Sequence, residues 1–304
     1  MNLNAYGYGP PDNRRWILAD LGVTFGDETT PGIDLICADP DFLADEEIEA
    51  IFLTHAHEDH IGATGLLYER LRTDAPMYAT PFTAELVRQK LRERGLDDDP
   101  ILNAIPMESQ VKAGPFTVRY VTLTHSIPEP NALAIETPLG LVLHTGDWKI
   151  DPDPTLGDDI DIEGLTALGD RGVLAMVCDS TNVFVEGEAG SEASVREALK
   201  ELIAGLEGRV AVTTFASNVA RVKSVIEAAA EAGRSVCLVG RSMHKVTDAA
   251  IQTGILKNLP DFVDEEDAGA LPPDNILYLC TGSQGEPRAA LSRIARGDHR
   301  NVTL

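Results

Sequence analysis

The sequence predicts a layered α/β protein with two domains. Three observations lead to this prediction: short apolar strands and amphipathic helices are interspersed in the first part of the chain, helices and strands alternate regularly after residue 191, and no apolar stretch is long enough to span a membrane. With 304 residues, the chain can bury a core without disulfide bonds. Its size is therefore compatible with an enzyme.

The first part of the chain contains short apolar segments and two segments with helical spacing. In residues 83–94, Leu86, Val87 and Leu91 recur on one helical face. Pro138 separates two strand patterns and indicates a hairpin. We expect strands at residues 16–21, 50–54, 116–124, 132–137 and 139–144, and helices at residues 64–71 and 83–94.

In the later part of the chain, helix and strand patterns alternate regularly. Helices are expected at residues 194–206, 218–232 and 244–253, and strands at residues 210–215, 235–239 and 276–280. This regular alternation is typical of parallel βαβ units. We therefore expect one domain over residues 1–182 and a second over residues 183–304.

The composition favours a reduced, cytoplasmic protein. Its four cysteines lie far apart, without a Cys-x-x-Cys pair and mostly in strand-like runs, and the first residues lack the pattern of a signal peptide. The formal net charge of -24 argues against a basic surface that grips nucleic acid. Part of that charge lies in expected solvated loops, at residues 97–99, 151–161 and 264–267, and bound cations would invert the local potential at a site, so a nucleic-acid substrate stays possible.

The strongest functional signal is the segment Thr-His-Ala-His-Glu-Asp-His at residues 54–60, directly after an apolar strand. Three of the seven histidines lie within six residues there, and crowded imidazoles and carboxylates would be unsatisfied without a cation. Residues two apart in an extended turn project the same way, so His55 and His57 can share one ion. Asp59 and His60 then face a second ion.

Two further residues complete the expected metal set. His125 and Asp147 each follow a strand, and a carboxylate at residue 147 can bridge two ions. An ordinary turn aspartate is the alternative for Asp147, and His144 is expected to pack within its strand. The ligand set favours Zn²⁺, while the carboxylates leave Mn²⁺ possible. Two ions 3.5–4 Å apart activate a hydroxide and clamp the attacking and leaving oxygens, which suits phosphodiester hydrolysis.

Other acidic residues are candidates for catalytic support. Asp59 and His60 lie where catalysis is expected, and Asp20 and Asp179 are candidates to orient the imidazoles by hydrogen bonds. Simple turn capping is the alternative for both Asp20 and Asp179.

These residues resemble a known family. The pattern His55-x-His57-x-Asp59-His60, with His125 and Asp147, is similar to the metallo-β-lactamase superfamily, whose fold is an αβ/βα sandwich. A finer resemblance, to the ribonuclease J family of β-CASP ribonucleases, rests on the segments Thr124-His-Ser-Ile-Pro128, Gly146-Asp-Trp-Lys149, Asp179-Ser-Thr-Asn182, Phe215-Ala-Ser-Asn218, Gly240-Arg-Ser-Met243 and Thr281-Gly-Ser-Gln-Gly-Glu286.

The resemblance implies an inserted β-CASP domain and a function in RNA decay and processing. Family members degrade RNA from a 5′-monophosphate end and also cut internally. The segment Phe215, Ala216, Ser217 and Asn218 matches a family segment that touches RNA, and helix N-terminal amides favour phosphate. Helix capping is an equally good explanation of Ser217 or Asn218.

The resemblance also indicates a chain cut short at both ends. The usual first strand and glycine-rich turn are expected to precede Met1, and the later histidine motifs, final strands and dimerisation domain to follow Leu304. The full-length parent is therefore expected to form a homo-oligomer. Alternatives to a ribonuclease are an inactive fragment, a non-catalytic subunit that binds RNA or metal, and another metallo-β-lactamase-fold hydrolase.

Overall fold

The computed structural model describes residues 1–96 and 101–303, and the chain divides into two compact units. The first unit comprises residues 1–125, 129–150 and 158–187, and the second comprises residues 126–128, 151–157 and 188–304. The last and longest segment of the second unit begins at Glu188, whereas the sequence predicted that the second domain begins at residue 183. The acidic residues 97–99 lie outside the described residues.

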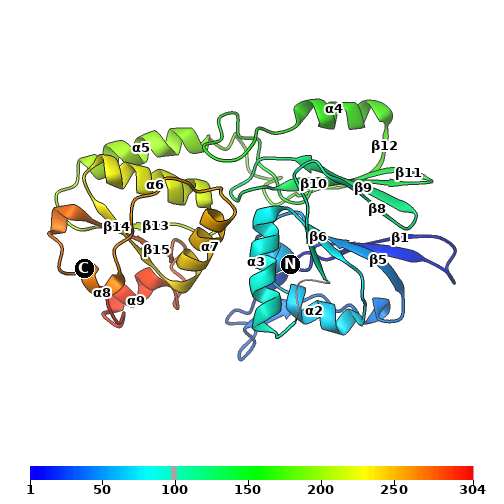
Figure 1. Ribbon diagram of the computed structural model, residues 1–304, viewed down its shortest axis with the longest axis horizontal. Helices are drawn as coiled ribbons and strands as arrows, with labels where there is room; N and C mark the ends of the chain where they lie inside the picture. Colours follow the sequence, from blue (N-terminus) through cyan, green and yellow to red (C-terminus); the bar gives the residue numbers. More distant parts are fainter. Residues whose placement is uncertain (97–100, 304) are drawn as a thin grey trace. The chain divides into compact units, whose positions relative to one another are not determined.

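Two five-stranded sheets form the centre of the first unit (Figure 1). The first has the order β1-β2-β5-β6-β7 and the second β12-β11-β10-β9-β8. The strands of the first sheet are β1 (Asn4–Tyr8), β2 (Arg15–Ala19), β5 (Glu47–Phe52), β6 (Met77–Ala79) and β7 (Leu102–Ala104). Those of the second are β8 (Gln110–Ala113), β9 (Phe116–Thr122), β10 (Asn131–Thr137), β11 (Gly140–His144) and β12 (Val173–Val177), and a separate hairpin joins β3 (Val23–Phe25) to β4 (Leu35–Cys37).

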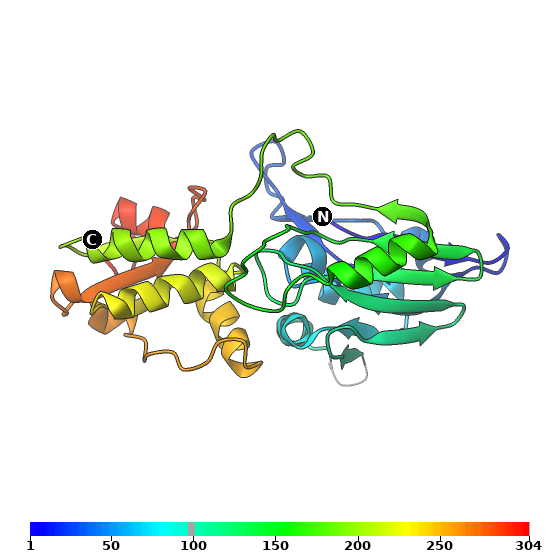
Figure 2. The same ribbon diagram turned by 90° about the horizontal axis from the view of Figure 1, so that it is seen from above.

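The two sheets face each other across a shared core. Phe52 of the first sheet packs with Tyr120 and Leu133 of the second, because alternate side chains of each strand point to the same face. The helices of the unit are α1 (Glu58–Ile61), α2 (Thr64–Leu71), α3 (Pro81–Glu93) and α4 (Ile162–Arg171), with a 3₁₀ turn η1 (Asp41–Leu43). Leu168 of α4 packs against the outer face of the second sheet, and α2 and α3 lie on the first (Figures 1 and 2). This layering confirms the expected αβ/βα sandwich.

The second unit is built on a parallel sheet with the order β13-β15-β14. Its strands are β13 (Val210–Thr213), β14 (Ser235–Val239) and β15 (Ile276–Cys280), and its helices are α5 (Glu192–Ala204), α6 (Val219–Glu231), α7 (Arg241–Gln252), α8 (Glu265–Ala268) and α9 (Ala290–Arg296), with a 3₁₀ turn η2 (Pro273–Asn275). In β14, Val236 and Leu238 pack with α6, whereas Cys237 and Val239 pack on the opposite face with α8 and α9. The expected parallel βαβ arrangement is confirmed.

Some local expectations were wrong. Residues 265–268 form the short helix α8 instead of a loop. Cys178 is exposed and Cys37 is partly exposed, so only Cys237 and Cys280 are the buried thiols that the sequence suggested.

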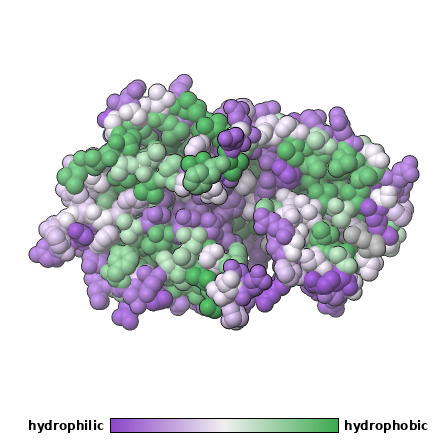
Figure 3. All heavy atoms as spheres, turned by 180° about the vertical axis from the view of Figure 1, so that it is seen from behind, coloured by the Kyte–Doolittle hydropathy of each residue, from purple (hydrophilic) through white to green (hydrophobic). Residues whose placement is uncertain are grey.

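No helix within the described ranges is long and apolar enough to cross a membrane. Apolar side chains also reach the surface, among them Leu174 and Met176 of β12, and hydrophobic residues form several areas on the face shown in Figure 3.

Candidate metal centre

The candidate site lies where strands of both sheets of the first unit end. Thr54–His60 follows β5, His125 follows β9 and Asp147 follows β11. Two glycines permit the close approach of these loops. A Cβ atom on Gly22 would lie 1.6 Å from the carbonyl oxygen of Asp59, and Gly146 takes a left-handed φ of 57° just before Asp147. The backbone therefore brings together carboxylates and imidazoles from three distant segments.

Four side chains form what we call the first half-site: His55, His57, His125 and Asp147. Their ligand atoms all lie within 4.8 Å of one another. His57 Nδ1 lies 3.1 Å from His55 Nε2 and 3.2 Å from His125 Nε2. Three imidazoles and one carboxylate are the donor types that Zn²⁺ takes in proteins.

Asp59, His60 and Asp147 form the second half-site, and their ligand atoms also lie within 4.8 Å of one another. His60 Nε2 lies 3.2 Å from Asp147 Oδ1 and 3.4 Å from Asp59 Oδ2. The other oxygen of Asp147, Oδ2, lies 4.0 Å from His125 Nε2. Asp147 thus presents one oxygen to each half-site, as a bridging carboxylate does.

The histidines of the first half-site are kept neutral. Burial lowers the pKa of His55 far below its usual value, and repulsion from neighbouring imidazoles lowers it further. Burial, followed by His125, lowers the pKa of His57 to about 3, and burial also lowers the pKa of His125. At neutral pH these rings therefore retain the nitrogen lone pairs that a divalent cation needs, so the residues fit such an ion.

His60 has the opposite electrostatic environment. Burial alone would lower its pKa, but the charge of Asp20 and hydrogen bonds with Asp147, Asp20 and Asp59 raise it to about 12. Asp20 is fully buried and lies 2.7 Å from His60 Nδ1. That contact directs the Nδ1 hydrogen to Asp20 and leaves Nε2 facing the other carboxylates.

The remaining expected site residues have other surroundings. Asp179 accepts hydrogen bonds from the backbone and hydroxyl of Thr181, at 2.8 and 2.7 Å, which is the turn-capping geometry. Asn218 in the second unit accepts a bond from the backbone of Arg221 and caps α6, while Phe215 is exposed. Ser217 is partly buried and Ala216 is buried. RNA contact by residues 215–218 remains a prediction.

Sequence reasoning missed Asn2 and Tyr6. Asn2 Nδ2 lies 3.0 Å from Asp59 Oδ2 and 2.9 Å from His60 Nε2, and Tyr6 Oη lies 2.9 Å from His144 Nδ1. Neither residue is part of a motif with a recognisable spacing. The pairing of β1 with β2 sets Tyr6 opposite Ile17. Asn2 is held by backbone hydrogen bonds, from its N–H to the carbonyl oxygen of Asp59 at 2.8 Å and from the N–H of Gly22 to its own carbonyl oxygen at 2.7 Å.

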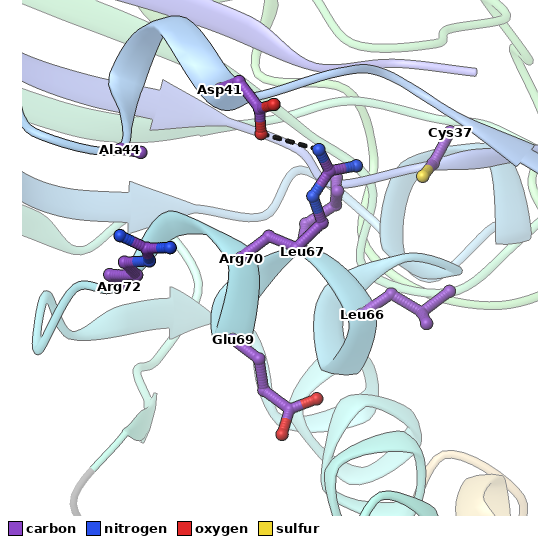
Figure 4. Close-up of a pocket in the computed structure, with 8 residues that line it drawn as sticks. All are labelled: Cys37, Asp41, Ala44, Leu66, Leu67, Glu69, Arg70 and Arg72. Atoms are coloured by element: carbon purple, nitrogen blue, oxygen red, sulfur yellow. Dashed lines mark hydrogen bonds and ion pairs between the residues drawn. The ribbon is translucent and has the colours of Figure 1, made fainter.

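A cavity of about 370 Å³ adjoins the second half-site. Its lining includes Asp59, His60 and Asp147 together with Asp179 and Ser180. A larger hollow of about 980 Å³ elsewhere in the first unit is lined by Cys37, Asp41, Arg70 and neighbouring residues (Figure 4). None of its lining residues belongs to either half-site, and Arg70 there is paired with Asp41 at 2.6 Å. The candidate metal ligands therefore line the smaller cavity and not this hollow.

Comparison with known proteins defines the class. Residues 15–161 match the family model described as "Beta-lactamase superfamily domain", and residues 207–304 match "Ribonuclease J, beta-CASP domain". The fold, the two half-sites and these matches make this a metallo-β-lactamase-fold protein with a β-CASP domain. A solved structure from Enterococcus faecalis V583, titled a protein of unknown function, shares the fold with a TM-score of 0.60 at 17% identity, covering 90% of this chain and 73% of that one.

Sequence relatives identify the family more closely. The chain is 48% identical to "Ribonuclease J" of Sinorhizobium meliloti over 100% of its length and 46% identical to "Ribonuclease J" of Mycolicibacterium smegmatis over 95%. It covers 54% and 52% of those two proteins, and so spans about half the length of the curated relatives it matches. Over nearly its whole length the chain is therefore similar to ribonuclease J, with the β-lactamase-type and β-CASP domains matched separately. This family fold implies binding of divalent metal ions, which the His/Asp cluster could hold.

Proposed function

We propose that this chain provides the metal centre of a metal-dependent ribonuclease that hydrolyses RNA phosphodiesters. The observation that carries the proposal is the pair of half-sites sharing Asp147, each with its ligand atoms within 4.8 Å of one another. The relatives named "Ribonuclease J" indicate RNA as the substrate. We include both 5′-to-3′ exonuclease and endonuclease activity in the proposal.

Zinc is the metal that we propose for both half-sites. Imidazole-rich donor sets suit Zn²⁺, and Mn²⁺ is the second choice because the second half-site contributes two carboxylates. When bound, two such ions lower the pKa of a water molecule and stabilise the attacking and leaving oxygens of a displacement at phosphorus.

The residues of the chain have separate tasks in this scheme. His55, His57 and His125 offer neutral nitrogens, which burial keeps free of protons. Asp20 holds the His60 ring by its Nδ1 atom, 2.7 Å away, and thereby aims Nε2 at the second half-site. Asp147 faces both half-sites and sets their separation.

The second unit would supply contacts to RNA. We propose that Phe215, exposed for stacking, and the start of α6 at Asn218 contact the RNA backbone and bases. The net charge of -24 means that cations at the site would have to offset repulsion of phosphate.

The free cysteines of the described structure support a cytoplasmic location, and we propose a homo-oligomer for the full-length protein.

Metal analysis and cleavage assays on the 304-residue chain test the proposal. We expect metal-dependent cleavage of a 5′-monophosphorylated RNA by the wild type and none by His57→Ala, with the far-UV circular dichroism of the two chains unchanged. His244→Ala is the control, because His244 is an exposed histidine of α7 outside the half-sites. Undiminished cleavage by His57→Ala would contradict the mechanism.

A non-catalytic metal-binding or RNA-binding subunit is the second candidate. It is favoured by one observation: the second half-site contains three ligand residues in the described part of the chain, whereas the first contains four. Metal binding and RNA binding without cleavage would support this candidate over the nuclease.

A further inference from the structure

A partly buried tyrosine and a buried histidine form a pair beside Asp20, the residue that contacts His60 of the second half-site. Tyr6 of β1 and His144 of β11 are 138 residues apart in sequence, yet Tyr6 Oη lies 2.9 Å from His144 Nδ1. The two rings meet edge to face, with an interplanar angle of 81°. His144 is only 4% exposed, so its polar atoms have little access to water.

The second nitrogen of His144 faces Asp20. His144 Nε2 is buried without a hydrogen-bond partner and lies 3.8 Å from Asp20 Oδ2. This separation exceeds a hydrogen bond but permits a strong charge–dipole interaction in a buried setting. The ring therefore connects Tyr6 with the carboxylate that holds His60.

The pairing with Tyr6 determines which ring nitrogen carries hydrogen. Burial, with the charge of Asp20, raises the pKa of Tyr6 well above its usual value, so its hydroxyl stays protonated. If Tyr6 donates to Nδ1, the hydrogen of the neutral imidazole is on Nε2 and points to Asp20. If Tyr6 instead accepts from Nδ1 of a neutral ring, a bare lone pair on Nε2 faces the carboxylate and is repelled. The arrangement without repulsion thus has hydrogen on Nε2.

Asp20 needs such support because it is a carboxylate without solvent. Its exposed fraction is 0%, and it takes a left-handed φ of 64°, which is uncommon outside glycine. Thr54 donates from its backbone to Asp20 Oδ1 at 2.8 Å and contacts Oδ2 through its hydroxyl at 2.9 Å. A buried anion is costly unless neighbouring hydrogens stabilise it, and an Nε2 hydrogen on His144 adds to those from Thr54 and His60.

We propose that Tyr6 and His144 are positioning residues that hold Asp20 in place and thereby control the affinity of the second half-site for its ion. The inference rests on the proposed metal function, but it concerns two residues that are not ligands themselves. Loss of either residue frees the Asp20 carboxylate to turn away from His60. The His60 ring then loses its fixed direction, while the first half-site keeps all four of its ligand residues.

Metal titration of variants tests the inference. We expect Tyr6→Phe and His144→Leu to weaken binding of the second Zn²⁺ equivalent by up to about 10-fold without changing the first. This is the lower end of the range for loss of a hydrogen-bond partner of a ligand, because both residues act through Asp20. His144→Gln retains a donor amide and should recover part of the affinity. Tyr68→Phe is the matched control, because it removes a buried tyrosine hydroxyl bond to Ala75 in the same unit.

The outcomes separate this inference from the proposed function. Unchanged binding of the second ion in both variants, or an equal loss in Tyr68→Phe, would overturn the positioning role alone. A wild-type chain that binds fewer than two ions contradicts both the inference and the proposed function. If a variant does not fold, ¹⁵N NMR of the metal-free wild type decides: hydrogen on Nε2 of His144 is expected, and hydrogen on Nδ1 alone overturns the inference.

Discussion

The two half-sites differ in charge although the same short segment supplies ligand residues to both. His57 has a pKa lowered to about 3 by burial and by its imidazole neighbours, whereas His60, three residues later, has a pKa raised to about 12 by its carboxylate neighbours. The backbone causes this division. His57 is extended, with φ -69° and ψ 149°, and α1 begins at Glu58, so the turn sends Asp59 and His60 in a different direction.

Residue type alone does not define a metal site, because histidines three residues apart have opposite pKa shifts here. Without an ion, His55 and His57 of the first half-site are neutral, because burial and repulsion between protonated imidazoles both lower their pKa values. In the second half-site, the pKa of His60 is raised by the carboxylates of Asp59 and Asp147 and by that of Asp20 next to it, so the protonated ring is favoured. We therefore expect the two half-sites to bind their ions with different affinities, pH dependences and sensitivities to mutation.

Removal of Asp147 should have the largest effect because both half-sites share it. We expect Asp147→Ala to weaken both ions by more than the roughly 10- to 100-fold that loss of an outer partner causes, since a direct ligand is removed. Calorimetric titration with Zn²⁺ measures both equivalents. If one equivalent kept its full affinity, Asp147 would belong to a single half-site.

Single-site removals should separate the two ions. His57→Ala is expected to abolish binding of the first ion and to spare most of the second, and Asp59→Ala is expected to do the reverse. Stoichiometry by elemental analysis after dialysis, with His244→Ala as control, distinguishes the variants. Loss of both ions in both variants would show one cooperative centre instead of two half-sites.

The pH dependence of binding should differ between the ions. An ion at the second half-site displaces the Nε2 proton of His60, whose pKa is about 12, so its affinity should rise about tenfold per pH unit between about pH 6 and 9. The first half-site releases fewer protons in this range, because the pKa values of His55 and His57 lie well below it and burial also lowers that of His125. Titrations at several pH values measure both slopes, and equal slopes would contradict the assigned charges.

Asp20→Asn should have the smallest of these effects. Asparagine tolerates the left-handed φ of 64° and can still accept from His60, but it removes the negative charge. We expect the second ion to bind about tenfold more weakly and the first to be unaffected. A Co²⁺ titration followed by visible absorption reports both ions, and an equal weakening of the two would argue for general destabilisation.

Much of the fold could be predicted from local patterns. Residues 64–71 form α2 as the apolar spacing indicated, and Pro138 lies in the turn of the hairpin between β10 and β11. The alternation after residue 191 gave the parallel sheet of the second unit. In contrast, β12 was missed because its sequence, Val173–Val177, is continuously apolar and does not alternate.

The site was only partly accessible from sequence. The six expected ligand residues do lie together, because their spacing within one loop and their positions after strands are local features. Their binding of metal is still a prediction. The contact between Tyr6 and His144 has no sequence signal, since it depends on β1 and β11 coming together from opposite sheets. The capping role of Asp179 likewise follows from its turn with Thr181 and not from its residue type.

Metal stoichiometry of the purified 304-residue chain tests the central claim most directly. Elemental analysis after loading with Zn²⁺ and removal of excess metal should give two ions per chain, one for each half-site. One ion or none would contradict a centre in which Asp147 serves two ions.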